Sequence, residues 1–241
     1  MRRTITLVAL ALFFINAANA QVWLELGLKG MMGFTGFYNK NISNDSRHDS
    51  QLGLATSVGG VAAFNIGEYH GLNIEALGAT HHQSFTFRGD DGKNNAINME
   101  WKSTDVYLLY RWYRDNGAFL EIGPKVTYIR DAQQSYGTDW ADVKDKYADK
   151  YYSAAFGVGG FVTTSEVLTV KTGLRAEYAL TDLISAQGQA DGYPSPYANF
   201  ESYAETRPFR LGLYMEVTFG VGGIAQAMCG RRGFLFGTRY K

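Results

Sequence analysis

Apolar and polar residues alternate along almost the whole chain after residue 20, and no long segment has the 3.6-residue period of an amphipathic helix. One face of each alternating segment carries Leu, Val, Ile, Phe and Tyr. The other face carries Gly, Ala and Ser interleaved with charged residues. The pattern predicts an all-β chain. The eight expected strands lie at about 21–38, 50–66, 71–88, 97–113, 117–130, 150–163, 167–182 and 203–220.

The links between these strands alternate in length. The long polar links are about 39–49, 89–96, 131–149 and 183–202, and the short ones are about 67–70, 114–116 and 164–166. A chain that runs up and down through a barrel places the long links at one rim and the short ones at the other, as outer-membrane barrels do. The sequence therefore predicts an eight-stranded antiparallel up-and-down transmembrane β-barrel over 21–220, with no internal domain boundary.

A soluble eight-stranded barrel, such as a lipocalin, would show the same alternation. Three features favour the membrane. Small residues on the charged face suit the narrow interior of an eight-stranded barrel, strands of about 14–18 residues are long for globular proteins, and aromatic residues near strand ends suggest interfacial belts. The belt expected at the long-link rim is Phe34, Phe37, Tyr38, Phe85, Phe87, Trp101, Tyr151 and Tyr152. The belt expected at the short-link rim is Phe64, Tyr69, Trp112, Tyr113 and Phe219.

Residues 1–20 have the features of a secretory signal peptide. Arg2 and Arg3 precede an apolar stretch, and Ala18-Asn19-Ala20 is a small-x-small cleavage site, so the mature chain is expected to begin at Gln21. A transmembrane anchor is the less favoured alternative, because the apolar run is shorter than the roughly 20 residues that a spanning helix needs. The expected location is the outer membrane of a Gram-negative bacterium.

Composition narrows the classes further. The 241 residues include 23 basic and 23 acidic side chains without a basic cluster, which argues against nucleic acid as a partner. The single cysteine, Cys229, excludes a disulfide framework and a cysteine-based zinc site. Contents of 28 Gly, 16 Tyr and 15 Phe suit a β-protein with aromatic girdles.

Charged residues recur on the face that is expected to line the barrel lumen. Six are basic and five are acidic, and an unpaired charge there would be costly, so we expect mutual pairing. A closed, salt-bridged lumen and a proton or solute path both remain open, with the closed lumen favoured. The expected lumen charges are Glu25, Lys29, Glu75, Arg111, Glu121, Lys125, Lys171, Arg175, Glu177, Arg210 and Glu216.

The chain resembles the PorT-like outer-membrane β-barrel proteins common in Bacteroidetes. The resemblance covers about 21–220 and rests on the signal ending in Ala-Asn-Ala, the Gly-rich first strand LELGLKGMMGF, and the SVGG and GVGG segments at 57–60 and 157–160. It implies a barrel that serves as a subunit of a secretion or export complex and has a protein partner there.

The last expected strand, RLGLYMEVTFG, resembles the signal that the barrel-assembly machinery reads. The residues that carry this resemblance are Arg210, Gly212, Met215, Val217 and Phe219. Such barrels usually end close to the last aromatic residue, but this chain continues over 221–241. We expect that segment to be a periplasmic tail, with a further short strand at 234–240 as the alternative.

Histidines are the main candidates for chemistry. His81 and His82, with Ser84 nearby, are the best match to the Ser/His/acid set of lipid-A-modifying barrel enzymes. Neighbouring strand residues point to opposite faces, so these two histidines would not share a metal ion. His48 and His70 are expected at opposite rims. The acidic link 139–149 lacks the ligand order of an EF-hand. We therefore expect no catalytic, cofactor or metal site.

The expected function is that of a non-enzymatic barrel with a structural or surface-interaction role, whose long loops lie outside the cell. Its expected partners are outer-membrane lipids and, during biogenesis, the barrel-assembly machinery. A subunit of a secretion complex is the first alternative, and a lipid-A-modifying enzyme is the second. A porin is least favoured, because an open aqueous lumen requires more strands.

Overall fold

The computed structural model describes residues 22–89, 92–137, 139–165, 168–198 and 200–221. The predicted signal peptide and, apart from Val221, the predicted tail lie outside the described residues. Within the described part of the chain, none of the helices has the length and apolar character needed to cross a bilayer.

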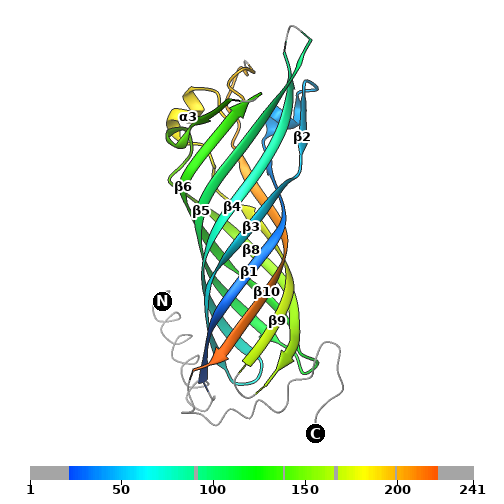
Figure 1. The fold of residues 1–241 in the computed structure, drawn as a ribbon, viewed down its shortest axis with the longest axis vertical. Coiled ribbons are helices and arrows are strands. Elements are labelled where there is room, and N and C mark those ends of the chain that lie inside the picture. Colours follow the sequence, from blue (N-terminus) through cyan, green and yellow to red (C-terminus); the bar gives the residue numbers. More distant parts are fainter. Residues whose placement is uncertain (1–21, 90–91, 138, 166–167, 199, 222–241) are drawn as a thin grey trace, which may run out of the picture.

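Eight long strands form a closed antiparallel ring (Figure 1). Each strand pairs with the next along the chain, and the last pairs with the first from Glu25 opposite Gly220 to Tyr38 opposite Arg207. This confirms the predicted eight-stranded up-and-down barrel. The ring strands are β1 (Val22–Tyr38), β3 (Gly53–Ile66), β4 (His70–Arg88), β5 (Asn94–Tyr113), β6 (Ala118–Tyr136), β8 (Lys150–Thr164), β9 (Leu168–Ala179) and β10 (Arg207–Gly220).

The two ends of the barrel differ, as the link lengths predict. At one end, here called the short-turn end, the strands are joined by tight turns, two of which use glycines with positive φ, Gly67 and Gly117. At the other, the long-loop end, the links carry further structure (Figure 1). Those elements are α2 (Lys40–Asn44), β2 (His48–Gln51), β7 (Asp139–Asp142), the 3₁₀ helix η1 (Lys144–Lys146) and α3 (Ala186–Ala190).

Strands β5 and β6 extend farther than the alternation predicts. The expected end of β6 was about residue 130, but the strand runs to Tyr136. Lys102 pairs with Asp131 whereas Ser103 pairs with Ile129, so Arg130 is an extra residue in β6. This β-bulge places Arg130 and Asp131 in succession on the outer side and shifts the phase of the alternation. The alternation of apolar and polar residues is interrupted at the bulge, so the sequence predicts an end of β6 there although the strand continues with the opposite phase.

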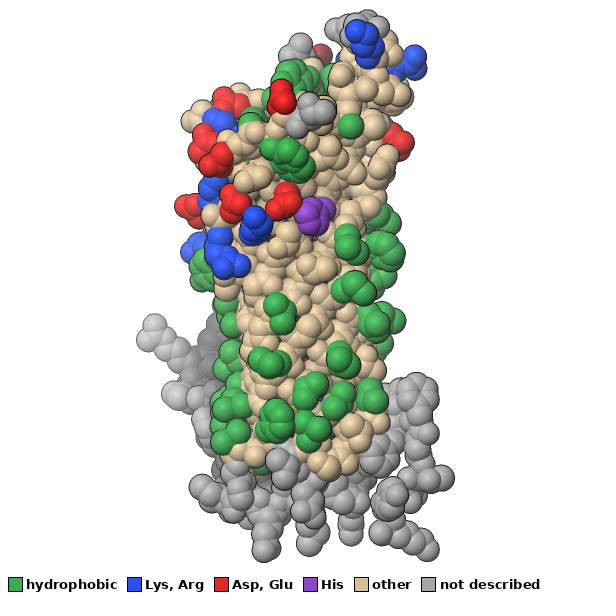
Figure 2. All heavy atoms as spheres, viewed as in Figure 1, with side chains coloured by type: hydrophobic (Ala, Val, Ile, Leu, Met, Phe, Trp, Pro, Cys, Tyr) green, Lys and Arg blue, Asp and Glu red, His purple; other side chains and the backbone are tan. Residues whose placement is uncertain are grey.

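The apolar face of each strand forms the outer wall. Leu28, Ile122, Phe156 and Leu213 are each more than half exposed, with exposed fractions of 68%, 58%, 51% and 56%. Figure 2 shows apolar side chains over the middle and short-turn end of the wall, and Lys, Arg, Asp and Glu gathered nearer the long-loop end. This distribution is that of a membrane-spanning barrel.

The expected aromatic belts are only partly correct. Phe34, Tyr38 and Tyr152 face outward near the long-loop end, as Phe64 and Trp112 do near the short-turn end. Six others face the interior, because the two-residue period separates them from their outward neighbours. The inward residues are Phe37, Phe85, Phe87, Trp101, Tyr113 and Tyr151.

Candidate functional site

Eight charged side chains form a continuous ion-pair network inside the barrel, which we call the lower network. Arg111 Nη2 lies 2.5 Å from Glu216 Oε2, and Arg175 Nη1 lies 2.7 Å from Glu75 Oε2. Four cations and four carboxylates balance within it. Its members are Glu25, Lys29, Glu75, Arg111, Glu121, Lys171, Arg175 and Glu216.

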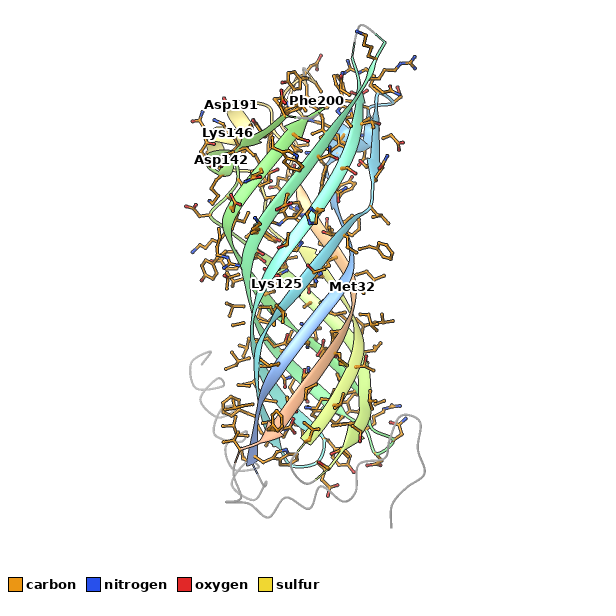
Figure 3. The ribbon with its side chains drawn as sticks, in the orientation of Figure 1. Met32, Lys125, Asp142, Lys146, Asp191 and Phe200 are labelled. Carbon is orange, nitrogen blue, oxygen red and sulfur yellow. The ribbon has the colours of Figure 1, made fainter. Side chains whose placement is uncertain are left out.

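A second, smaller group lies nearer the long-loop end, and we call it the upper network. Lys125 Nζ lies 3.0 Å from Asp105 Oδ2 and 2.7 Å from Glu177 Oε2, and the Tyr107 hydroxyl donates to Glu177 at 2.9 Å. Figure 3 labels Lys125 near the middle of the barrel's length. Arg210 is buried on the same side of the lumen and has no ion-pair partner among the described residues; its Nη2 donates to the Ser57 hydroxyl at 3.1 Å, and its Nε and Nη1 have no hydrogen-bond partner.

The structure buries all eleven side chains that the sequence placed in the lumen. It adds Asp105, which sequence reasoning left out of that set. Asp105 shares its strand face with Tyr107 and Arg111, so alternation alone would have found it. With Asp105 the lumen holds six cations and six carboxylates. This balance matters because a buried charge without a partner is strongly destabilising.

Apolar side chains cover both ends of these networks. Toward the short-turn end, the rings of Tyr113, Phe119 and Phe161 pack on one another. Met31 and Tyr214 belong to the same buried cluster, and Tyr214 lies among the charges, with its ring beneath Lys29 Nζ. Toward the long-loop end, the His81 ring stacks on Trp101 with centroids 4.9 Å apart and planes within 5°. Large rings therefore fill a lumen in which the sequence suggested mainly small residues.

The long loops close the barrel as an ordered cap, by which we mean segments 39–52, 139–149, 180–198 and 200–206. The Asn39 side chain accepts from the first turn of α2 and donates to Ala204 O at 2.8 Å, so it ties the first long loop to the last. Beneath the cap is a continuous apolar core. It includes Phe37, Ile42, Phe85, Phe87, Ile97, Met99, Trp101, Val143, Tyr147, Tyr151, Leu183, Ile184 and Ala198.

A Ser–His–Asp arrangement joins two loops of the cap. His48 Nε2 lies 2.9 Å from Ser195 Oγ, and His48 Nδ1 lies 3.2 Å from Asp45 Oδ2. The order of hydrogen bonds is that of a nucleophile, a base and an orienting acid. However, Ser195 has no exposed surface and the His48 side chain is fully covered. We call this arrangement the latch, because it holds the first long loop against the last.

The histidines singled out from the sequence do not assemble a site. His81 points inward onto Trp101, whereas His82 points outward with Nδ1 3.2 Å from Glu100 Oε2. The candidate residues for lipid-A chemistry, His81, His82 and Ser84, are therefore not brought together. His48 and His70 do lie at opposite ends. The latch was missed because 147 residues separate His48 from Ser195, and no local motif links them.

A family model described as an outer membrane protein beta-barrel domain matches residues 18–185, more than half of the chain. The chain belongs to this family. Outer-membrane β-barrel membership places the protein in the outer membrane of a Gram-negative bacterium.

Solved structures of other barrels are similar to this one. OprG from Pseudomonas aeruginosa is 10% identical, with 84% of this chain and 96% of that chain covered and a TM-score of 0.45. Neisserial surface protein A is 8% identical, with 80% and 96% covered and a TM-score of 0.44. Ail of Yersinia pestis is 9% identical, with 81% and 97% covered and a TM-score of 0.35. No curated protein sequence matches the chain.

A cavity of about 320 Å³ opens in the cap of this family member, between α2 and the loop that contains Ser195. Asn41, Gln189, Tyr193, Phe200 and Tyr203 contribute to its walls. The view in Figure 3 shows Phe200 and Asp191 at the long-loop end, where this cavity lies. Aromatic rings beside amide groups are suited to binding a small polar ligand.

Burial sets the protonation of the latch. Burial lowers the pKa of the His48 imidazole below its ordinary 6.5, and neighbouring Asp45 only partly opposes that effect. Hydrogen bonds from Arg47 lower the pKa of Asp45 to about 2. At neutral pH the latch therefore contains a neutral imidazole and an ionised carboxylate.

We expect the cap to loosen as the pH falls from 7.5 to 5.5. The opened cap binds a proton on His48 more readily than the closed cap, so closure is favoured above about 6.5 and is progressively lost below it. The measurement is the rate of proteolytic cleavage in segment 180–206 at both pH values, normalised to an unstructured substrate. His48→Gln removes the titrating group, so its normalised rate should not change with pH. Equal normalised rates for the unaltered protein at the two pH values would contradict the expectation.

Proposed function

We propose that this protein is a non-enzymatic outer-membrane barrel whose closed lumen supports a rigid, capped surface outside the cell. The observation that supports this proposal is the filled interior of the barrel. Paired charges fill the middle of the barrel, aromatic side chains cover the short-turn end and the cap covers the other. A lumen filled in this way serves as a scaffold for the cap rather than as a passage. Removal of the signal peptide after Ala20 forms part of this proposal.

The test of the closed lumen is conductance of the purified barrel in a planar lipid bilayer. We expect no single-channel steps, because water and ions would have to displace buried, mutually paired side chains. An open porin added afterwards to the same bilayer controls for membrane quality. Folded insertion is checked by the mobility of the unheated protein on a gel. Reproducible steps from the folded barrel alone would contradict the proposal.

The PorT-like resemblance supports a second candidate, a subunit of a secretion or export complex. This role predicts a partner held in stoichiometric amount. Affinity purification of the tagged barrel from outer membranes in mild detergent tests it. A stoichiometric partner that survives high salt would support the complex, whereas a barrel recovered alone would favour the independent surface role.

The latch gives one specific reason to keep a hydrolytic role as a third candidate. Ser195, His48 and Asp45 have the required bonding order, although the serine is covered. Under the non-enzymatic proposal, a serine-directed fluorophosphonate does not label the folded barrel. Labelling that disappears in Ser195→Ala, while the variant still folds, would support the hydrolytic role instead.

A further inference from the structure

The cavity in the cap is held open by contacts between the first and last long loops. Asn39 Nδ2 donates to Ala204 O at 2.8 Å, and Asn41 Nδ2 donates to Ser202 O at 2.6 Å. All four residues contribute to the cavity wall. A ligand that enters the cavity therefore meets two loops that are already ordered, and binding is tighter to a site of that kind.

Three aromatic side chains contribute to the wall, and two of them are fixed by contacts outside it. The Phe200 ring lies 5.8 Å from the ring of His48 in the latch. The Tyr203 hydroxyl donates to Asp182 Oδ2 at 2.5 Å. The third is Tyr193, which packs on the apolar core of the cap. Rings held in this way offer flat apolar faces and lose little side-chain freedom when a ligand binds.

The polar groups of the wall are amides and one neutralised carboxylate. Asp191 is the only charged side chain among the described residues that line the cavity. Its Oδ2 lies 2.7 Å from Lys146 Nζ and 3.2 Å from Gln187 Nε2, and its Oδ1 takes part in neither contact. A wall with this charge balance suits an uncharged ligand that carries hydroxyl groups better than it suits a phosphate, a sulfate or a cation.

The size of the cavity and its surroundings favour a compact ring as the ligand. A volume of about 320 Å³ is at the lower end of the range for small-molecule sites, roughly 300–1,000 Å³. Tyr197 lies in the chain between two wall residues and is 61% exposed, and its ring is 4.5 Å from that of Tyr136 with the planes at 88°. An exposed ring fixed beside the cavity offers a further apolar face to a longer ligand.

We propose that the cap cavity binds one neutral sugar unit of a glycan. A pyranose ring has C–H groups on its faces and hydroxyl groups around its edge, so it needs an apolar ring and hydrogen-bonding groups in the same small site. Phe200 and Tyr203 supply the first, and the amide and carboxylate oxygens of the wall supply the second. The inference rests on the proposed function, because it names a ligand class for the proposed surface role and takes the outward position of the cap from it.

The test is saturation-transfer NMR on the barrel in a detergent without sugar or aromatic groups, with only the aromatic protons of the protein irradiated. The probes are the methyl glycosides of glucose, galactose, mannose and N-acetylglucosamine. We expect the C–H protons of at least one probe to receive saturation, with a Kd of about 1 mM for a ligand of this size. Phe200→Leu keeps an apolar side chain and removes the ring, so it should weaken binding about fivefold or more.

A second variant tests the cavity itself. Ala190 is the last residue of α3 and contributes to the wall, so Ala190→Trp reduces the space and should abolish the transfer. The matched control is Ala186→Trp, at the first residue of the same helix, which is also exposed and does not line the cavity. This control should bind the probes as the unaltered protein does. Gel mobility of unheated protein and the rate of proteolysis of the cap verify the folding of each variant.

Three results would overturn the assignment. The first is no transfer to any of the four glycosides at about ten times the expected Kd. The second is unchanged affinity in both Phe200→Leu and Ala190→Trp. The third is transfer to an uncharged alanine tetrapeptide but to none of the glycosides, which would identify a peptide site. A barrel that conducts no ions and gives one of these results would retain the proposed function and lose only the sugar site, whereas channel steps would overturn the proposed function itself.

Discussion

Glu216→Gln lowers the free energy of unfolding by about 3–5 kcal/mol, the cost of removing one partner from a buried ion pair. Glu216 accepts from both terminal nitrogens of Arg111, at 2.8 and 2.5 Å, and also from Lys171 and Lys29. Glutamine nearly preserves the shape and removes the charge. Three anions then face four cations in the lower network. Urea titration of the barrel in lipid vesicles, followed by gel mobility, measures the change.

Glu205→Gln is the matched control for this substitution. Glu205 pairs with Arg207 through an Nη2–Oε2 distance of 2.5 Å, but its side chain is 55% exposed. An exposed pair of this kind contributes about 0–1 kcal/mol. A Glu216→Gln effect as small as that of Glu205→Gln would show that the lower network is solvated rather than sealed.

Gly27→Val reduces the folded fraction of the barrel about tenfold or more, because it separates the two strands that close the ring. A Cβ at Gly27 would overlap the carbonyl oxygen of Val217 on β10, and it would lie 2.7 Å from the Cα of Thr218. The obstacle is backbone, which cannot rotate away. The measurement is the fraction of protein with folded mobility after refolding into vesicles.

The control for this prediction lies on the same strand. Gly30 faces outward, and no atom lies within 4 Å of a Cβ built on it, so Gly30→Val should refold as the unaltered protein does. Equal folded fractions for the two variants would show that β1 and β10 do not approach as closely as the structure has them.

The alternation of apolar and polar residues is enough to predict the barrel, because its outer face contacts lipid and its inner face lines a charged lumen. The same reasoning placed eleven charges in the lumen and would have included Asp105 had the face of Arg111 been followed along the strand. It did not predict which carboxylate each cation contacts. That depends on neighbours around the ring, as where Glu75 of β4 meets Arg175 of β9.

The ordered structure of the cap could not be predicted from the sequence, for a physical reason. Its order comes from contacts between distant segments, such as Asn39 with Ala204 and His48 with Ser195. The links are polar and lack a period, so they resemble solvent-exposed loops. The inward aromatics that support them, including Phe85 and Trp101, occur near strand ends, where aromatic residues are also typical of a lipid interface. The bulge at Arg130 and the length of β5 and β6 show that the barrel wall continues past the apolar band toward the long-loop end.

The charge balance of the lumen also bears on how the barrel is assembled. Without β10 the lower network has four cations against three anions, since Glu216 is missing, and the lumen has also lost Arg210. A partial sheet exposed to lipid would therefore carry charges that no neighbour neutralises. The charge balance of the lumen is therefore complete only when β10 has joined the sheet. The strand that completes the balance is also the one whose sequence resembles the assembly signal.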